Sequence, residues 1–261
     1  MTPMTILDRF RLDGQIALVS GAARGLGWEM ARALAEAGAR VILHGRTDTA
    51  ILPRAAELAG RGLAADTISF DMGDAAATER AMDTVLARHG HIDILLNNVG
   101  ERDRRSVQRI TPEDFDRLVS VDLGAVYRLI KRVMPGMIER RHGRIVCVTS
   151  IVDQLAANGS PSYTAAKGGL AALTRALAAE LGPHNITCNA IAPGFFATET
   201  NSTMTQGESG ARRARRVPLN RWADPGEIAG AALLLASPAG GYINGHTLVV
   251  DGGISATYDM L

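Results

Sequence analysis

An α/β fold with a doubly wound, open parallel sheet and helices on both faces is predicted by two features of this sequence. Short apolar runs alternate with Ala- and Leu-rich helical stretches along the chain. The runs are continuously apolar, which is typical of strands buried on both faces. Helices between successive strands imply right-handed crossovers and hence parallel strands. We expect residues 1–261 to form a single domain.

The strands are expected, in chain order, at residues 16–20, 41–44, 63–70, 92–96, 144–149, 186–191 and 247–250. The first helix is predicted over residues 26–37, where Gly38 ends it. Residues 195–220 break the alternation, because they carry Thr, Gly, Ser and Arg just after a predicted strand end. Ligands bind beyond the carboxyl ends of strands in such sheets, so this segment is interpreted as a substrate lid.

Composition narrows the class of protein. The 261 residues are 46% hydrophobic with a net charge of +1, which argues against a disordered chain or a general nucleic-acid binder. Cys147 and Cys188 lie in apolar runs, so we expect buried thiols in a reducing compartment. The sequence shows no metal-ligand spacing, signal core or membrane-length apolar window. A cytoplasmic protein without a metal, membrane or nucleic-acid partner is expected.

A glycine-rich turn follows the first strand and opens the first helix. It reads Ser20-Gly21-Ala22-Ala23-Arg24-Gly25-Leu26-Gly27, with the spacing G-x-x-x-G-x-G. Glycine permits a tight turn and a close approach of the backbone to a pyrophosphate, and the start of a helix offers unpaired N–H groups. A Rossmann-like dinucleotide-binding loop is predicted, against the alternative of a plain tight turn.

The second strand ends in His44-Gly45-Arg46, without the acidic residue that would bind the ribose 2′-hydroxyl of NAD. Arg24 and Arg46 could instead clamp a 2′-phosphate through charge-assisted hydrogen bonds. The alternative is that both are solvated surface arginines. We expect NADP(H) to be favoured over NAD(H).

Tyr163 and Lys167 are spaced i, i+4 on a predicted helix, so their side chains share a face. That helix has Ser160 as a candidate N-cap and Pro161 as its first residue, and Ser150 ends the preceding strand. A phenol has a pKa near ~10, which a neighbouring ammonium lowers. The set favours proton transfer by Tyr163 to a substrate oxygen bound by Ser150. The alternative is an exposed helix pair without chemistry.

Further motifs extend this pattern over the whole chain. They are Asp71-Met72 after the third strand, Asn97-Asn98-Val99-Gly100 after the fourth, Pro193-Gly194 leading to Thr198, and Val250-Asp251-Gly252-Gly253. Together with the glycine loop and the Ser150, Tyr163 and Lys167 set, they make the chain similar to the short-chain dehydrogenase/reductase family.

The resemblance implies a role for each matching residue. Tyr163 would be the acid and base, Lys167 would bind the nicotinamide ribose and tune the tyrosine, and Ser150 would position the substrate. Thr198 would hold the carboxamide. The expected cofactor contacts are Gly21, Arg24, Gly25, Leu26, Gly27, Arg46, Asp71, Met72, Asn98, Val99, Gly100, Tyr163, Lys167, Pro193, Gly194 and Thr198. A homotetramer is also implied, and the apolar residues 228–236 and the apolar last strand need such cover.

One position departs from the family pattern. Many members have a fourth catalytic residue, an asparagine in a V-N-x-x-G-like stretch, which helps to hold a water in the proton relay to the lysine. This chain has Asp122 there. As a carboxylate, Asp122 could hold that water, but it would also stabilise a positive Lys167 and disfavour phenolate. The alternative is a tolerated helix residue whose backbone does the relevant bonding.

The expected reaction moves a hydride between the nicotinamide and a carbonyl or secondary alcohol carbon. Residues 41–46, 187–198 and 243–255 resemble gluconate 5-dehydrogenases, which implies a sugar acid or polyol as substrate. Two arginine groups could bind a carboxylate or could be solvated faces. They are Arg102, Arg104 and Arg105 after the fourth strand, and Arg212, Arg213, Arg215 and Arg216 in the lid segment.

Two other functions remain open. A 3-oxoacyl-carrier-protein reductase would also need basic residues at its entrance, because its carrier is acidic. A non-catalytic NADP(H)-binding sensor would keep the glycine loop but could lose the proton chemistry. Ser150, Tyr163 and Lys167 are all present, which disfavours the sensor.

Overall fold

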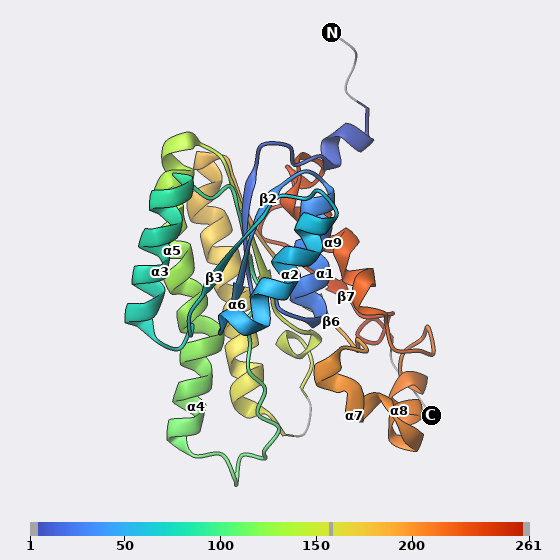
Figure 1. The fold of residues 1–261 in the computed structure, drawn as a ribbon. Helices are drawn as coiled ribbons and strands as arrows, with labels where there is room; N and C mark the ends of the chain where they lie inside the picture. The colour runs from blue at the N-terminus through green and yellow to red at the C-terminus, as the bar shows by residue number, and fades with distance from the viewer. Residues whose placement is uncertain (1–4, 157–158, 258–261) are drawn as a thin grey trace.

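One parallel sheet runs through the computed structural model, which describes residues 5–156 and 159–257. Its strands are β1 (Ile16–Ser20), β2 (Arg40–Gly45), β3 (Ala65–Ser69), β4 (Ile94–Asn97), β5 (Gly143–Val148), β6 (Ile186–Pro193) and β7 (Thr247–Val250). Their order across the sheet is β3-β2-β1-β4-β5-β6-β7, with every neighbouring pair parallel (Figure 1). The predicted doubly wound sheet is confirmed, and each expected apolar run overlaps a strand.

The winding direction reverses between β1 and β4. The chain moves outward from β1 through β2 to β3, then returns to the other side of β1 and continues from β4 to β7. In the register of these two strands, Ser20 pairs with Asn97. The glycine loop after β1 and the polar turn after β4 therefore leave the sheet side by side, at the kind of crevice where open α/β sheets bind ligands.

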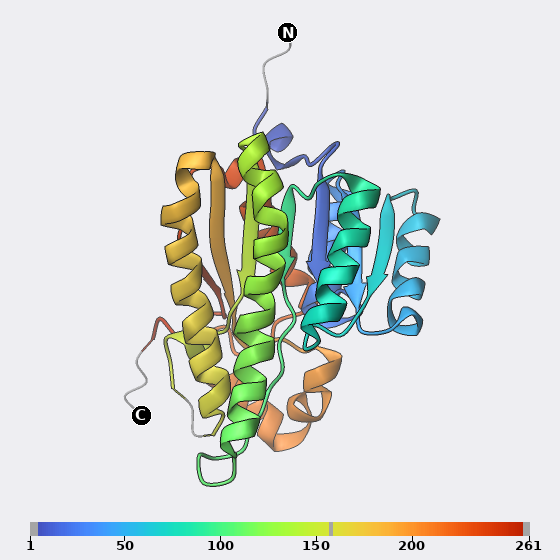
Figure 2. The same ribbon diagram turned by 90° about the vertical axis from the view of Figure 1, so that its left-hand side faces the viewer.

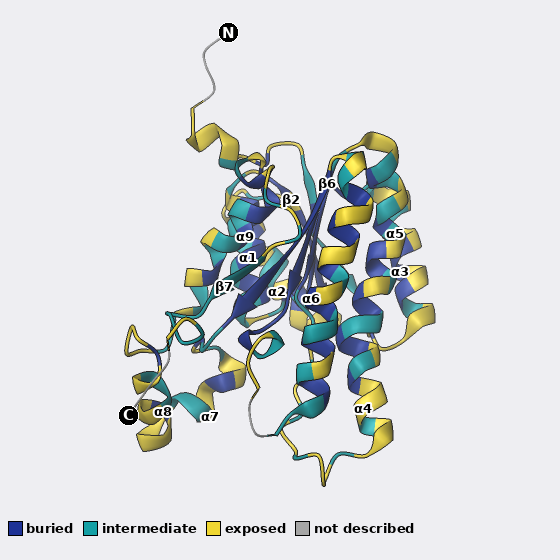
Figure 3. Ribbon diagram, turned by 180° about the vertical axis from the view of Figure 1, so that it is seen from behind, coloured by how far each residue is buried: buried dark blue, intermediate teal, exposed yellow. Residues whose placement is uncertain are grey.

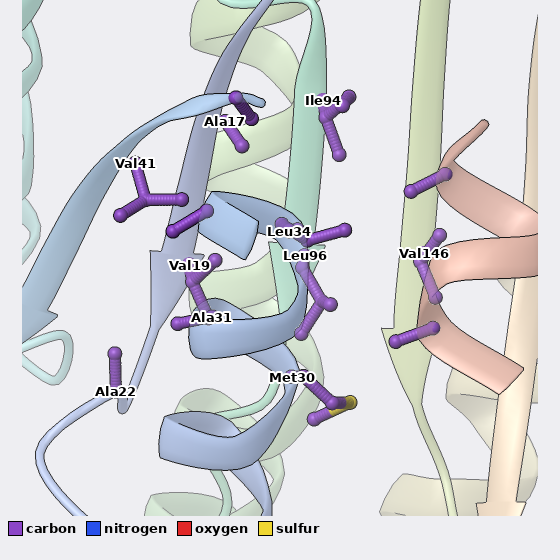
Figure 4. Close-up of a cluster of buried hydrophobic side chains, with 14 of the residues drawn as sticks. Ala17, Val19, Ala22, Met30, Ala31, Leu34, Val41, Ile94, Leu96 and Val146 are labelled. Carbon is purple, nitrogen blue, oxygen red and sulfur yellow. The ribbon is translucent and has the colours of Figure 1, made fainter. Parts of the chain in front are cut away.

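Helices cover both faces of the sheet (Figure 2). One face carries α1 (Gly25–Glu36), α2 (Asp48–Gly60) and α9 (Ala229–Ala236), and the other carries α3 (Ala75–His89), α5 (Ala125–Arg140) and α6 (Pro161–Leu181). Each face of the sheet has its own hydrophobic core, because successive strand residues face opposite sides. Val19 packs in the core on the α1 side (Figure 4), and Leu18 packs in a second core on the α5 side. The five inner strands are buried almost throughout, as the dark ribbon of Figure 3 shows, whereas the edge strands β3 and β7 are half-buried.

The second core contains both cysteines, which are buried and free as predicted. Burial raises the pKa of Cys147 to about 11, so this thiol stays neutral. No helix in the described ranges is long and apolar enough to cross a bilayer.

Some predicted boundaries were wrong by one or two residues. Strand β6 runs on to Pro193 because that residue still pairs with Val250 of β7. Strand β4 starts at Ile94 rather than at residue 92, and α1 spans Gly25–Glu36. Pairing with a neighbouring strand, rather than local composition, decides where a buried run stops being a strand.

Short elements surround the carboxyl ends of the strands, at the lower end of the sheet in Figure 1. Helix α4 (Pro112–Val119) passes through a π-helical turn, η2 (Ser120–Gly124), into α5. The predicted lid segment contains η5 (Glu199–Asn201), α7 (Ser202–Thr205) and α8 (Gly207–Arg215). Other short helices occur elsewhere along the described chain: η1 (Leu7–Phe10), η3 (Ile151–Asp153), η4 (Gly182–His184), η6 (Pro225–Ile228) and η7 (Pro238–Gly240).

Candidate active site

The turn between β1 and α1 leaves no room for side chains on its inner side. Gly21 and Gly25 have φ angles of +66° and +55°, which favour glycine. A Cβ on Gly27 would lie 2.2 Å from the carbonyl oxygen of Gly21. Helix α1 starts without a side-chain cap at Arg24, so the N–H groups of its first turn, where Leu26 lies, suit an anion. The loop therefore fits the predicted pyrophosphate site.

A buried histidine holds the start of this loop. The His44 Nδ1 at the end of β2 accepts a hydrogen bond from the Gly21 N–H at 3.2 Å, and Nε2 lies 3.0 Å from the Phe70 carbonyl oxygen. Both contacts are satisfied when Nε2 carries the proton. Burial lowers the pKa of His44 to about 4, so the ring stays neutral. The role of His44 was not among the predictions, although a histidine at the end of an apolar strand is a signal for a buried polar contact.

The turn after β4 is tied to the glycine loop. Ser20 Oγ accepts hydrogen bonds from the Asn98 and Val99 N–H groups at 2.9 and 3.2 Å. The Asn98 side-chain amide donates to the Gly21 carbonyl at 3.1 Å. These bonds hold the ends of β1 and β4 together, and Gly100 follows beside the Lys167 ammonium.

The side of the site predicted to bind the 2′-phosphate carries Arg24 and Arg46, both exposed and without an ion pair among the described residues. Asp71 is also exposed, while Met72 is buried beside it. Packing also disfavours an acidic side chain in place of Gly45, because a Cβ there would lie 3.3 Å from the Ile51 Cβ of α2.

The predicted lid reaches back to the glycine loop. Gly194 continues β6 through a hydrogen bond from its N–H to the Val250 carbonyl at 2.9 Å, after Pro193. The Thr198 Cγ2 would lie 3.3 Å from a Cβ on Gly25. A cavity of about 420 Å³ opens between the start of α1, near Trp28, and residues 197–205. Thr198 and the glycine loop thus border the same crevice.

The proton-transfer candidates lie at the ends of β5 and α6. Tyr163, Lys167 and Ser150 are all buried. The Lys167 Nζ donates to the Val148 carbonyl at 3.1 Å and lies 5.7 Å from the centroid of the Tyr163 ring. The shared helical face of Tyr163 and Lys167 is confirmed. Ser160 takes the N-cap position with φ +66°, but the predicted side-chain cap was wrong, because it makes no capping hydrogen bond.

Asp122 lies on the π-helical turn η2 and is fully buried. Its Oδ1 accepts the Glu101 N–H at 2.7 Å, and its Oδ2 lies 3.5 Å from the Lys167 Nζ. The side chain therefore contacts the predicted lysine directly. Burial raises the pKa of Asp122, and the charge of Lys167 works against that rise.

Arg102 and Arg104, from the loop after β4, lie near Tyr163, and the charge of Arg213 on α8 acts on Arg104. The Arg102 guanidinium lies 5.4 Å from the centroid of the Tyr163 ring and donates to Asn201 Oδ1 at 3.4 Å. Burial lowers the pKa of Arg104, as do the positive charges of Arg102 and Arg213. Within the described residues, none of the three forms an ion pair with a carboxylate.

The other predicted arginines are not part of this cluster. Arg105 is paired with Asp103 and Asp114. Arg212 is exposed on α8 without a polar side-chain contact to a described residue, and Arg215 and Arg216 are exposed as well. The fold thus groups Arg102 and Arg104 of the first predicted run with Arg213 of the second, a selection that the sequence could not make.

Comparison with known proteins bears on this geometry. A family model described as enoyl-(acyl carrier protein) reductase matches residues 21–255. The gluconate 5-dehydrogenase of Gluconobacter oxydans (strain 621H) is 37% identical over 251 residues, which cover 96% of this chain and 98% of that protein. The chain belongs to the short-chain dehydrogenase/reductase family. As a member, it is an oxidoreductase that acts on CH–OH groups, which confirms the predicted enzyme class.

Solved structures of the family have the same architecture. A gluconate 5-dehydrogenase from Burkholderia cenocepacia J2315, in complex with NADP and tartrate, matches with a TM-score of 0.93 and 38% identity, over 97% of this chain and 100% of that chain. The 3-oxoacyl-(acyl-carrier-protein) reductase of Escherichia coli (strain K12) is 37% identical over 245 residues, or 93% of this chain and 98% of that protein. Identity alone therefore does not choose the substrate within the family.

Proposed function

We propose that this enzyme uses NADP(H) to interconvert a secondary alcohol and a ketone on a sugar acid, as a gluconate 5-dehydrogenase does. The observation that carries the proposal is a cluster of positive charge in which Arg102 lies 5.4 Å from the centroid of the Tyr163 ring. The charges of Arg102 and Arg213 both act on Arg104, and none of these three arginines has a carboxylate partner among the described residues. Guanidinium groups bind carboxylates in a planar, bidentate geometry. The cluster therefore suits a substrate that brings its own carboxylate to the tyrosine.

The cofactor site supports NADP(H). The pyrophosphate would lie on the loop formed by Gly21, Gly25 and Gly27, and Arg24 and Arg46 would bind the 2′-phosphate. Met72, Asn98 and Thr198 would border the rest of the dinucleotide. When bound, the nicotinamide supplies the hydride for reduction or accepts it in oxidation. The Burkholderia cenocepacia relative is a complex with NADP, which agrees with this choice.

Side chains of α6 and of the turn after β5 position the substrate oxygen and transfer the proton. In the reductive direction, the Tyr163 hydroxyl gives its proton to the substrate oxygen, which becomes the alcohol oxygen. Ser150 Oγ donates a hydrogen bond to that same oxygen and holds it for the transfer. The Lys167 ammonium stabilises the phenolate left behind, because it is buried close to the tyrosine ring. Oxidation of the alcohol runs these steps in reverse.

The substrate class follows from charge. The relative from Burkholderia cenocepacia was solved with tartrate, a hydroxy acid with two carboxylates. A 3-oxoacyl-carrier-protein reductase is the second candidate, favoured by the exposed Arg212 and Arg215 on α8, by Arg216 directly after it, and by similarity to that enzyme of Escherichia coli. An acidic carrier would bind to that face of α8, whereas a free sugar acid would bind at the arginine cluster near Tyr163.

A substrate panel with NADPH tests the proposal. We expect the highest kcat/KM for a keto derivative of a sugar acid, a lower value for the matching neutral ketose, and the lowest for a 3-oxoacyl thioester. A thioester that is turned over best would make the enzyme a carrier-protein reductase. Tight NADPH binding without turnover of any of these ketones would favour the sensor.

Assembly and location complete the proposal. Strand β7 is an edge of the sheet with half-buried residues, α9 is apolar, and Tyr242 beside them in sequence is fully exposed. We infer that copies of the chain cover this edge in a homotetramer, which light scattering at micromolar concentration would test.

The free thiols of Cys147 and Cys188 suit the reducing cytoplasm. Residues 195–220 would act as the lid.

A further inference from the structure

The buried pair of Asp122 and Lys167 is the most unusual feature of the site. Both side chains are almost completely shielded from solvent, and their nearest charged atoms are 3.5 Å apart. Gly100 covers the pair, because a Cβ there would lie 2.9 Å from Lys167 Nζ and 3.1 Å from Asp122 Oδ2. Beyond Lys167, Oδ2 has no hydrogen-bond donor among the described residues. The charge of this oxygen therefore acts mainly on the lysine.

Other charged side chains also lie around the tyrosine and the lysine. Arg102 and Arg104 lie near Tyr163 in the loop after β4, and the charge of Arg213 on α8 acts on Arg104. Glu101 gives its backbone N–H to Asp122, while its side chain is paired outward with Arg117. Asp122 is therefore the carboxylate that faces the lysine and tyrosine within the described residues.

We propose that Asp122 is a positioning residue which keeps Lys167 charged while partly cancelling its field at Tyr163, so that the tyrosine keeps its proton to higher pH than it would beside a neutral amide. The proposal rests on the proposed function, in which Tyr163 moves the proton. Its physical basis is Coulombic. An ammonium close to the phenol favours phenolate, and a carboxylate in contact with that ammonium opposes it. Burial makes both effects stronger than they would be in water.

The consequence is a bias in the direction of catalysis. Reduction of a ketone needs Tyr163 with its proton, and oxidation of the alcohol needs phenolate. A tyrosine that stays protonated at neutral pH is ready for reduction, while oxidation must wait for alkaline pH. We therefore expect the enzyme to act at neutral pH as a reductase of its keto acid.

The test compares the wild type with Asp122→Asn, which removes the charge and keeps an oxygen for the Glu101 N–H. Asp116→Asn is the matched control, since Asp116 is exposed on the adjoining α4 and forms no ion pair with a described residue. The tyrosine is titrated by its near-ultraviolet phenolate absorbance, with the Tyr163→Phe form of each protein subtracted. The pH profile of kcat/KM for alcohol oxidation is measured in parallel.

We expect Asp122→Asn to move both midpoints to lower pH by about one unit, which is about tenfold more phenolate at a given pH. Asp116→Asn should leave them in place. Unchanged midpoints, or a shift to higher pH, would overturn the proposal. If Asp122→Asn does not fold, Asp122→Ser carries the same expectation. The titration needs no substrate, so a failed sugar-acid assay with a shifted titration would reject the proposed substrate and leave this inference standing.

Discussion

His44 Nδ1 accepts a hydrogen bond from the backbone N–H of Gly21, and this contact joins the end of β2 to the first glycine of the glycine loop. The buried ring is neutral, with a pKa lowered to about 4 from the usual 6.5. Between these values the unfolded chain takes up a proton that the folded chain does not. The folded state is therefore fully stable, in this respect, above pH 6.5 and loses stability as the pH falls towards 4.

This loss of stability at low pH gives the first prediction. We expect the wild type to lose about 2 kcal/mol of unfolding free energy through His44 between about pH 7 and pH 5, measured by urea denaturation. The variant His44→Asn has no such group and keeps an amide oxygen near Nδ1, so its loss should be smaller and its NADPH affinity retained. His44→Leu should weaken NADPH binding at neutral pH. Equal acid sensitivity in wild type and His44→Asn would contradict this account.

Tyr163→Phe should abolish turnover while NADPH binding stays nearly intact. The change removes the hydroxyl that carries the proton but leaves the glycine loop and Lys167 in place. Steady-state rates and fluorescence titration with NADPH measure the two effects. A variant that keeps more than a few per cent of the wild-type rate would mean that another group transfers the proton.

Arg24→Ala and Arg46→Ala should each weaken NADPH binding by roughly tenfold to a hundredfold before solvent screening is counted, and should spare NADH. The reason is that both guanidinium groups are exposed without a carboxylate partner in the described chain, free to bind the 2′-phosphate. Dissociation constants for both cofactors provide the measurement. If the wild type binds NADH as tightly as NADPH, both arginines are ordinary surface residues.

Arg213→Ala should raise KM for a sugar acid and leave KM for a neutral ketone unchanged, because Arg213 adds to the positive charge around Arg104. Its neighbour Arg212 is exposed on the same helix, and Arg212→Ala is the matched control that should change neither value. Removing one charge-assisted contact predicts an effect of roughly tenfold or more, reduced by screening. Equal effects on both substrates would show that α8 stabilises the lid rather than recognising an anion.

Much of the cofactor site was predictable from sequence because its physics is local. A strand, a turn of closely spaced glycines and a helix start must present backbone N–H groups together, wherever the rest of the chain goes. Likewise, Tyr163 and Lys167 share a face through helical spacing alone. The order of strands and helices followed from hydrophobic runs, although their ends depended on pairing such as that of Pro193 with Val250.

Tertiary structure alone decided which charges meet. Sequence showed seven candidate arginines in two runs, and folding brought Arg102, Arg104 and Arg213 together while Arg105 was neutralised by Asp103 and Asp114. It also placed Asp122 against Lys167, and His44 against Gly21. Such contacts join residues far apart in the chain, and their strength depends on burial, which no local pattern specifies. The reaction class could therefore be inferred from motifs, whereas the charge balance around the tyrosine is a property of the folded molecule.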